Sequence, residues 1–308
     1  MAKKPIEVMS LKADTNPKTW AEAPLYWATI EYHRFWLSVD RPRLTVLSKA
    51  DGQMTPVLLR DIAREYKVSR NLKGQDKKNN GEDDTVANEI CNILNTAQPS
   101  FTDSLSERLA RAKDIIGNIR PYTAKASSKK KTQVTESNEE SATEESKTVD
   151  AASAATKFIW FMNPEGWTIF DQYAATGIGI PKNGRSALKR MDEFYTALEY
   201  EGFPRLVSDM RAFINKQAPM LKAMPAARIL DTLFMARGER GAASEHGIEL
   251  TKAYLGGLPQ PLRQQLSDLA NGLQKQFGPR PLVNCCEPIK RNKAWADKQA
   301  AKKNGECR

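Results

Sequence analysis

The most informative stretch of this chain is Lys157-Phe158-Ile159-Trp160-Phe161-Met162-Asn163-Pro164-Glu165-Gly166-Trp167-Thr168-Ile169-Phe170-Asp171. A lysine opens an apolar run, and an aspartate closes it. Pro164 and Gly166 break the helical pattern, so a turn is predicted between two helices. A buried charge is unfavourable unless it is paired or used. Lys157 and Asp171 are therefore the first candidates for a functional pair.

Apolar residues on both sides of this stretch recur with helical spacing, and almost no strand-like alternation occurs. The sequence predicts an all-α fold of many helices, either one interrupted domain or two helical lobes. The first helix is predicted to begin near Thr19 and to end at Val39–Arg43. The others are predicted at residues 55–66, 85–97, 105–119, 151–162, 167–176, 184–200, 204–216, 226–235, 245–255 and 261–277.

The net charge of +10 favours polyanionic partners or an anionic membrane surface. No apolar run approaches the roughly 20 residues that span a bilayer, so we expect no membrane partner. Four cysteines without a regular framework, and no secretory leader, indicate reduced thiols and a cytoplasmic location. Two histidines, no Cys-x-x-Cys pair and no phosphate-binding glycine loop predict neither a metal nor a cofactor.

A low-complexity segment divides the chain. Residues 123–149 hold a lysine cluster followed by Ser, Thr and Glu repeats, with no apolar face to offset the entropy lost on ordering. We expect a flexible, disordered acidic insertion there. It separates an N-terminal helical region, residues 1–122, from a second helical region, residues 150–279. Residues 280–308 form a basic tail, either a helix that follows a nucleic acid or a frayed end.

The spacing of Lys157 and Asp171 allows them to meet. On one straight helix they would lie about 21 Å apart at 1.5 Å per residue. Each lies seven residues from Pro164, so a chain that folds back there can place both at one height. A lysine near a helix N-terminus, partly buried, is favoured as a neutral, nucleophilic amine, although a nearby carboxylate opposes that shift. The alternative is a plain salt bridge at the neck of a helical hairpin.

A family resemblance bears on this choice. Residues 155–174, with Thr156-Lys157, an aromatic-rich helix, Pro164 and an apolar strip ending in Phe170-Asp171, resemble the core of the oxoguanine glycosylase branch of the helix-hairpin-helix DNA glycosylases. The resemblance implies that Lys157 is a Schiff-base nucleophile and Asp171 an essential carboxylate. A Leu-Pro-Gly-Val-Gly type of hairpin should precede the lysine, but residues 150–154 stand there instead. The nearest glycine hairpin is Ile115–Ile119, about forty residues upstream.

The resemblance implies an enzyme, a DNA N-glycosylase that flips out and excises a damaged or modified base and leaves an abasic site. A hypermodified phage base is one option for the excised base. Strand cleavage at the abasic site follows only if Lys157 forms a covalent bond to the sugar. The implied partner is double-stranded DNA, bound by a monomer through a catalytic region at residues 150–279. The alternative is a non-catalytic nucleic-acid-binding protein of phage defence or regulation, which kept the scaffold without the chemistry.

Further residues are candidates for contact with DNA or with the extruded base. Aromatic side chains commonly receive such a base, although core packing is the commoner role for each of them. Basic side chains can contact phosphates, and a solvated face or tether is their alternative role. The base-pocket candidates are Trp160, Trp167 and Phe170, and the DNA-binding candidates are Lys129, Lys130, Lys131, Arg185, Lys189 and Arg190.

Overall fold

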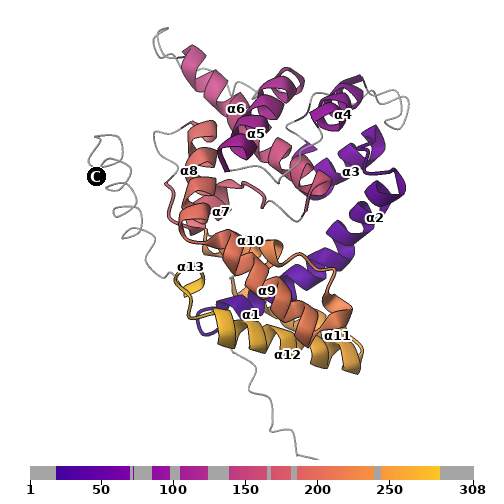
Figure 1. Cartoon of the computed structure of the whole chain (residues 1–308), viewed down its shortest axis with the longest axis vertical. Helices are drawn as coiled ribbons and strands as arrows, with labels where there is room; N and C mark the ends of the chain where they lie inside the picture. Colours follow the sequence, from indigo (N-terminus) through magenta and orange to yellow (C-terminus); the bar gives the residue numbers. More distant parts are fainter. Residues whose placement is uncertain are drawn as a thin grey trace, which may run out of the picture.

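A computed structural model of the chain describes residues 19–69, 72, 85–97, 105–123, 139–164, 168–181, 186–238 and 244–284. Within these ranges the regular structure is helical and contains no strand, which confirms the all-α prediction (Figure 1). None of the helices in these ranges combines the length and the apolar character needed to cross a bilayer.

The first helix does not end where the sequence predicted. Helices α1 and α2 are joined without a break by a π-helical turn, η1 (Pro24–Phe35, Arg41–Lys49 and Trp36–Asp40). Pro42 has no N–H to donate to the preceding turn. The guanidinium of Arg43 donates to two carbonyl oxygens of that turn, those of Ser38, at 3.5 Å, and Val39, at 2.8 Å. The helix therefore continues through the proline, and η1 places the Asp40 side chain in the interior.

The helices form two groups in Figure 1, an upper and a lower one. The upper group contains α3 (Pro56–Glu65), α4 (Thr85–Ala97), α5 (Leu105–Ile119), α6 (Glu139–Met162) and α8 (Ala187–Tyr200). The lower group contains α1, α9 (Phe203–Gln217), α11 (Glu245–Gly257) and α12 (Gln260–Phe277). Helices α7 (Gln172–Gly177) and α10 (Ala226–Arg237) lie between them. Short pieces are η3 (Arg120–Tyr122), η4 (Pro219–Leu221) and α13 (Pro281–Asn284).

The predicted boundary between residues 1–122 and 150–279 is not a structural division. Helix α1 packs against α10, α11 and α12, so the beginning of the described chain is surrounded by its end. The buried apolar residues of both predicted regions form one continuous cluster. Sequence order therefore does not separate two units, because helices far apart in the chain share one core.

Part of the predicted flexible insertion is helical. Residues 124–138 lie outside the described residues, but α6 begins at Glu139, twelve residues before the predicted start at Ala151. Glutamate and alanine favour helices, and a helix that is already nucleated extends cheaply along such a sequence. The segment Ile115–Ile119 is not a hairpin, because these residues form the end of α5, which confirms the helix predicted at 105–119. Residues 139–156, which precede Lys157, are thus continuous helix rather than a hairpin.

Candidate functional site

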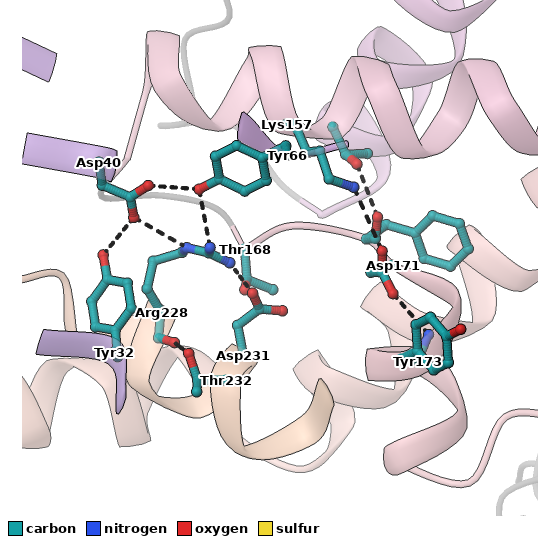
Figure 2. Close-up of polar contacts among 12 residues, drawn as sticks. Tyr32, Asp40, Tyr66, Lys157, Thr168, Asp171, Tyr173, Arg228, Asp231 and Thr232 are labelled. Carbon is teal, nitrogen blue, oxygen red and sulfur yellow. Dashed lines mark hydrogen bonds and ion pairs between the residues drawn. The ribbon is translucent and has the colours of Figure 1, made fainter. Parts of the chain in front are cut away.

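Lys157 lies in the second half of α6 and is almost completely buried, with 4% of its side chain exposed. Its ammonium donates to the backbone carbonyl and the hydroxyl of Ser153, one turn back, at 3.1 and 2.8 Å. Its Nζ atom lies 3.6 Å from Oδ2 of Asp171 (Figure 2). The predicted position near a helix N-terminus was wrong because α6 begins at Glu139. The helix dipole therefore does not act on this amine in the way expected.

Asp171 stands at the point where the returning chain becomes helical again. The hydroxyl of Thr156 on α6 donates to the carbonyl of Phe170 at 3.2 Å, which ties the returning segment to α6. Asp171 then caps α7, since its Oδ1 accepts a hydrogen bond from the amide of Tyr173 at 2.9 Å. Aspartate favours this capping position. The helix predicted from Trp167 therefore begins only at Gln172, and Oδ2 remains directed at Lys157.

Both side chains line one cavity of about 380 Å³. Its size lies within the usual range for pockets that hold small molecules, roughly 300–1,000 Å³. Segments far apart in the sequence form its walls, namely α1, the end of α3, α6, the segment before α7, α10 and α11. The charged residues that line it are Glu31, Glu65, Asp171 and Asp231, with Arg34, Lys67, Lys157 and Arg228. Opposite charges are thus balanced around an apolar interior, an arrangement typical of a binding or catalytic site.

A buried polar network borders this cavity (Figure 2). Asp40 accepts hydrogen bonds from the phenol groups of Tyr32, at 2.9 Å, and Tyr66, at 2.7 Å. The guanidinium of Arg228 donates to the Tyr66 hydroxyl at 3.1 Å and forms ion pairs with Asp40 and Asp231. The network therefore joins η1, the end of α3 and α10. Three of its members, Tyr66, Arg228 and Asp231, also line the cavity.

Burial sets the protonation of this network. It raises the pKa of Tyr32 and of Tyr66 well above the ordinary value, so both phenols keep their protons and act as donors. Burial also raises the pKa of Asp40, whereas the neighbouring Arg228 opposes that shift. Desolvation favours the neutral form of an acid, and a nearby cation favours the charged form. The two phenol donors and Arg228 together compensate for the buried carboxylate.

The aromatic residues predicted to form the base pocket do not line the cavity where they are described. Trp160 is fully buried, and its ring lies beneath the guanidinium of Arg228, 5.1 Å from ring centre to Cζ. Phe170 is buried against Phe194, with ring centres 5.8 Å apart. Trp167 lies outside the described residues. The prediction for Trp160 and Phe170 was therefore wrong, because both are core residues. The aromatic lining comes instead from Phe35 and Tyr66.

The predicted phosphate contacts are corrected at one position. Arg190 is 4% exposed, and its guanidinium donates to the backbone carbonyls of Gln172 and Ile180 at 3.4 Å. It stabilises the chain around α7 and is not available to a phosphate. Lys189 is exposed in the first turn of α8, so its assignment stays a prediction. Arg185 and the cluster Lys129, Lys130 and Lys131 lie outside the described residues.

Sequence reasoning missed Arg228 and Asp231. They stand three residues apart on α10, whose other residues are mostly apolar. A charged pair at that spacing inside a buried helix was a readable signal, because such residues are rarely buried unless they are paired. No comparable signal marked Phe35 or Tyr66, since an aromatic residue on a helical apolar face is usually part of a core.

The described residues contain no group of three His, Cys, Asp or Glu side chains that could hold a metal ion. The groups available for chemistry in the cavity include the amine of Lys157 and the carboxylate of Asp171. Comparisons of the chain with protein-family models, with characterised proteins and with solved structures found no match.

Proposed function

We propose that this protein is a DNA glycosylase, which turns a damaged or modified base out of double-stranded DNA and cleaves its bond to the sugar. One observation carries the proposal. Lys157 and Asp171, 3.6 Å apart and almost completely buried, line a common cavity whose other walls combine apolar and aromatic side chains with balanced opposite charges. An amine and a carboxylate at the edge of a base-sized cavity are the groups that this reaction uses.

Asp171 supplies the carboxylate. As the bond from base to sugar breaks, its electron pair leaves with the base and positive charge develops at C1′, which a nearby carboxylate stabilises. Oδ1 of Asp171 is fixed by the amide of Tyr173, so the orientation of Oδ2 is set before a substrate binds. A water molecule gives its proton to Asp171 and bonds to C1′. That proton passes to the departing base, and an abasic site remains.

Lys157 offers a second route for cleavage of the bond between base and sugar. Its neutral amine bonds to C1′ and displaces the base, while its proton passes to Asp171, 3.6 Å away, and from there to the departing base. The sugar ring then opens to a Schiff base, Asp171 takes a proton from C2′, and the 3′ phosphate leaves with the electron pair of its bond, which cleaves the strand. Water releases the lysine at the end. The hydrogen bonds from Lys157 to Ser153 must break before this route can begin, and the route through water has no such requirement.

A non-catalytic nucleic-acid-binding protein of phage defence or regulation is the second candidate. One observation favours it, namely that the ammonium of Lys157 already has hydrogen bonds to Ser153 and an ion pair with Asp171. Such a buried pair also occurs where it only holds two segments together. The net charge of +10 supports DNA binding in both candidates, and both predict binding that weakens steeply with salt.

Borohydride trapping tests Lys157 without knowledge of the base. In a duplex with one abasic site, a Schiff base between the lysine and the sugar is reduced to a stable protein–DNA adduct. The adduct should form with the wild-type protein and disappear in Lys157→Gln. Lys113→Gln is the matched control, because Lys113 pairs with Asp192 at 2.7 Å on the surface. An adduct that persists in Lys157→Gln contradicts the covalent role, and no adduct with the wild type leaves the route through water.

Mass spectrometry of released bases tests the reaction itself. The protein is incubated with oxidised DNA and with modified phage DNA, and the free bases are identified. Release that is present in the wild type and absent in Asp171→Asn supports the glycosylase. Duplex binding without release from any DNA supports the non-catalytic binder. This second outcome would overturn the enzymatic assignment of both residues.

A further inference from the structure

A second charged pair lies in the wall of the cavity, on α10. Arg228 and Asp231 line the cavity together with Lys157 and Asp171, and they are 3% and 0% exposed. Nη1 of Arg228 pairs with Oδ2 of Asp231. A charge removed from water is strongly unfavourable unless its polar atoms are satisfied. The partners of each carboxylate oxygen in this network therefore show which atoms are left for a ligand.

Asp40 is the other carboxylate next to Arg228, and both of its oxygens have partners within the protein. Oδ1 accepts from Tyr66, and Oδ2 accepts from Tyr32 and lies 3.8 Å from Nε of Arg228. Asp40 is also not among the residues that line the cavity. It serves the interior, where it joins η1 to α3 and α10, and it offers no free acceptor to a ligand.

Asp231 differs from Asp40 in one oxygen. Its Oδ1 is buried and accepts no hydrogen bond from any residue that the structure describes. In Figure 2 that oxygen points away from Arg228, toward the side on which Asp171 lies. Leaving such an acceptor unsatisfied costs roughly 1–3 kcal/mol, and more for a charged group. An unsatisfied acceptor in a cavity wall that also holds the candidate active site suggests a ligand that supplies the missing donor.

We propose that Asp231 is the specificity-determining residue of this cavity, whose Oδ1 accepts a hydrogen bond from the exocyclic amino group of a nucleobase. The substrate class is then an amino-bearing base, of the adenine, cytosine or guanine type. Glutamate and aspartate carboxylates accept hydrogen bonds in the same way from the N4 amino group of cytosine in DNA. Arg228 orients the carboxylate through its ion pair with Oδ2. This inference rests on the proposed function, since it assumes that the cavity receives an extruded base.

The binding test compares bases that differ only in the amino group. Duplexes carry one central nucleotide opposite an abasic analogue, which eases extrusion. Three matched pairs are used, namely adenine and purine, cytosine and pyrimidin-2-one, and guanine and hypoxanthine. Dissociation constants are measured by fluorescence anisotropy. At least one pair should favour the amino-bearing base by about tenfold or more, because a charged acceptor otherwise stays unpaired. No preference in any pair overturns the inference.

The variant Asp231→Asn should abolish or reverse that preference. Its amide oxygen faces Arg228, which places the NH₂ group where Oδ1 stood and turns the acceptor into a donor. Asp40→Asn is the matched control, since it removes a carboxylate from the same guanidinium but lies outside the cavity wall. Asp40→Asn should keep the amino preference. Equal effects of the two variants would assign Asp231 to the structural network alone.

A duplex with only an abasic analogue separates the two proposals. Wild-type binding to it without any amino preference overturns the role of Asp231 and leaves the proposed function intact. Lack of binding to any duplex contradicts the proposed function. Free nucleosides then test the cavity alone, by saturation-transfer NMR with adenosine and its analogue without the amino group. An amino preference lost in Asp231→Asn supports the inference, and equal or undetectable binding overturns it.

Discussion

Gly177 of α7 lies directly against the backbone of Phe234 on α10. A Cβ atom at Gly177 would come closer than 3.0 Å to the carbonyl oxygen of Phe234. Gly238, just after α10, contacts the backbone of Tyr173 in the same way. Only glycine lets two backbones approach so closely. This contact fixes α7, and with it Asp171 at its start, against the helix that carries Arg228 and Asp231.

Replacing Gly177 by alanine should push α7 and α10 apart. Overpacking of this kind costs about 1–3 kcal/mol, because backbone atoms must move. We expect the free energy of unfolding, measured with urea, to fall by that amount. Gly117→Ala is the control, since a Cβ there meets nothing within 4 Å and α5 should gain about 0.5–1 kcal/mol. Two variants of equal stability would contradict the close contact.

Asp171→Asn should separate catalysis from folding. Asparagine caps helices as well as aspartate does, so the hydrogen bond to the Tyr173 amide can persist. The ionised carboxylate is lost, and with it the stabilisation of charge at C1′. We expect base release to fall by at least about 100-fold, in line with the loss of one electrostatic group. Because the buried ammonium of Lys157 loses its ion-pair partner, the free energy of unfolding should fall too, by up to roughly 3 kcal/mol, so base release is measured well below the melting temperature.

The surface pair of Lys113 and Asp192 provides the control for that variant. Asp192→Asn removes the same kind of charge from a lysine partner 2.7 Å away, but outside the cavity. It should leave base release unchanged and alter stability by less than about 1 kcal/mol. Similar losses in the two variants would mean that net charge, and not the position of Asp171, governs the reaction.

The helices were predictable because their signals are local. Apolar spacing located each long helix of the described residues, and Pro164 marked the end of α6. Two local rules failed because of neighbouring groups in the chain. The Arg43 side chain donates to carbonyl oxygens of the turn that Pro42 interrupts, and the first helix continues. In α6, the C-terminal half forms a helix that extends back through residues 139–149, although the composition of these residues predicted a flexible chain.

The candidate pair was predictable from the sequence, but the cavity around it was not. The turn at Pro164 allowed Lys157 to meet Asp171, and the two lie 3.6 Å apart. The remaining walls come from helices that lie about two hundred residues apart in the chain, such as α1 with Glu31 and α10 with Asp231. No local pattern assembles such a set. For the same reason Arg190 was mistaken for a surface residue, since its backbone partners appear only after folding.

His33 should make the fold sensitive to acid. It is 1% exposed and interacts through Nδ1 with the Tyr254 hydroxyl at 2.7 Å, and burial lowers its pKa from 6.5 to about 4. Between these values the unfolded chain binds a proton that the folded protein does not. Stability is therefore full above pH 6.5 and falls as the pH drops toward 4, by roughly 3 kcal/mol.

Urea unfolding from pH 7.5 to 4 measures this loss. In His33→Gln the decline should be smaller by most of that amount, because glutamine does not titrate. His246 is exposed, so His246→Gln serves as the control and should follow the wild-type curve. Parallel curves for wild type and His33→Gln would show that the carboxylates alone cause the acid sensitivity.

Lys67, at the edge of the cavity, has a backbone conformation that favours glycine. Its φ is +58°, just after the end of α3, and its side chain is exposed. A non-glycine residue in this region is unfavourable by roughly 1–2 kcal/mol. Strain of this kind at a candidate site suggests a role for the side chain. We expect the ammonium of Lys67 to contact a phosphate of bound DNA.

Lys67→Gly should therefore be more stable than the wild type and yet bind DNA more weakly. The gain is expected to be about 0.5–1 kcal/mol, since greater freedom of the unfolded chain offsets part of the relieved strain. The slope of log K against log salt should fall by about one. Lys67→Arg should bind like the wild type. Asp51, with a φ of +51° away from the cavity, provides the control Asp51→Gly, which should gain stability without weaker binding. Unchanged binding by Lys67→Gly would leave its backbone strain without a functional reason.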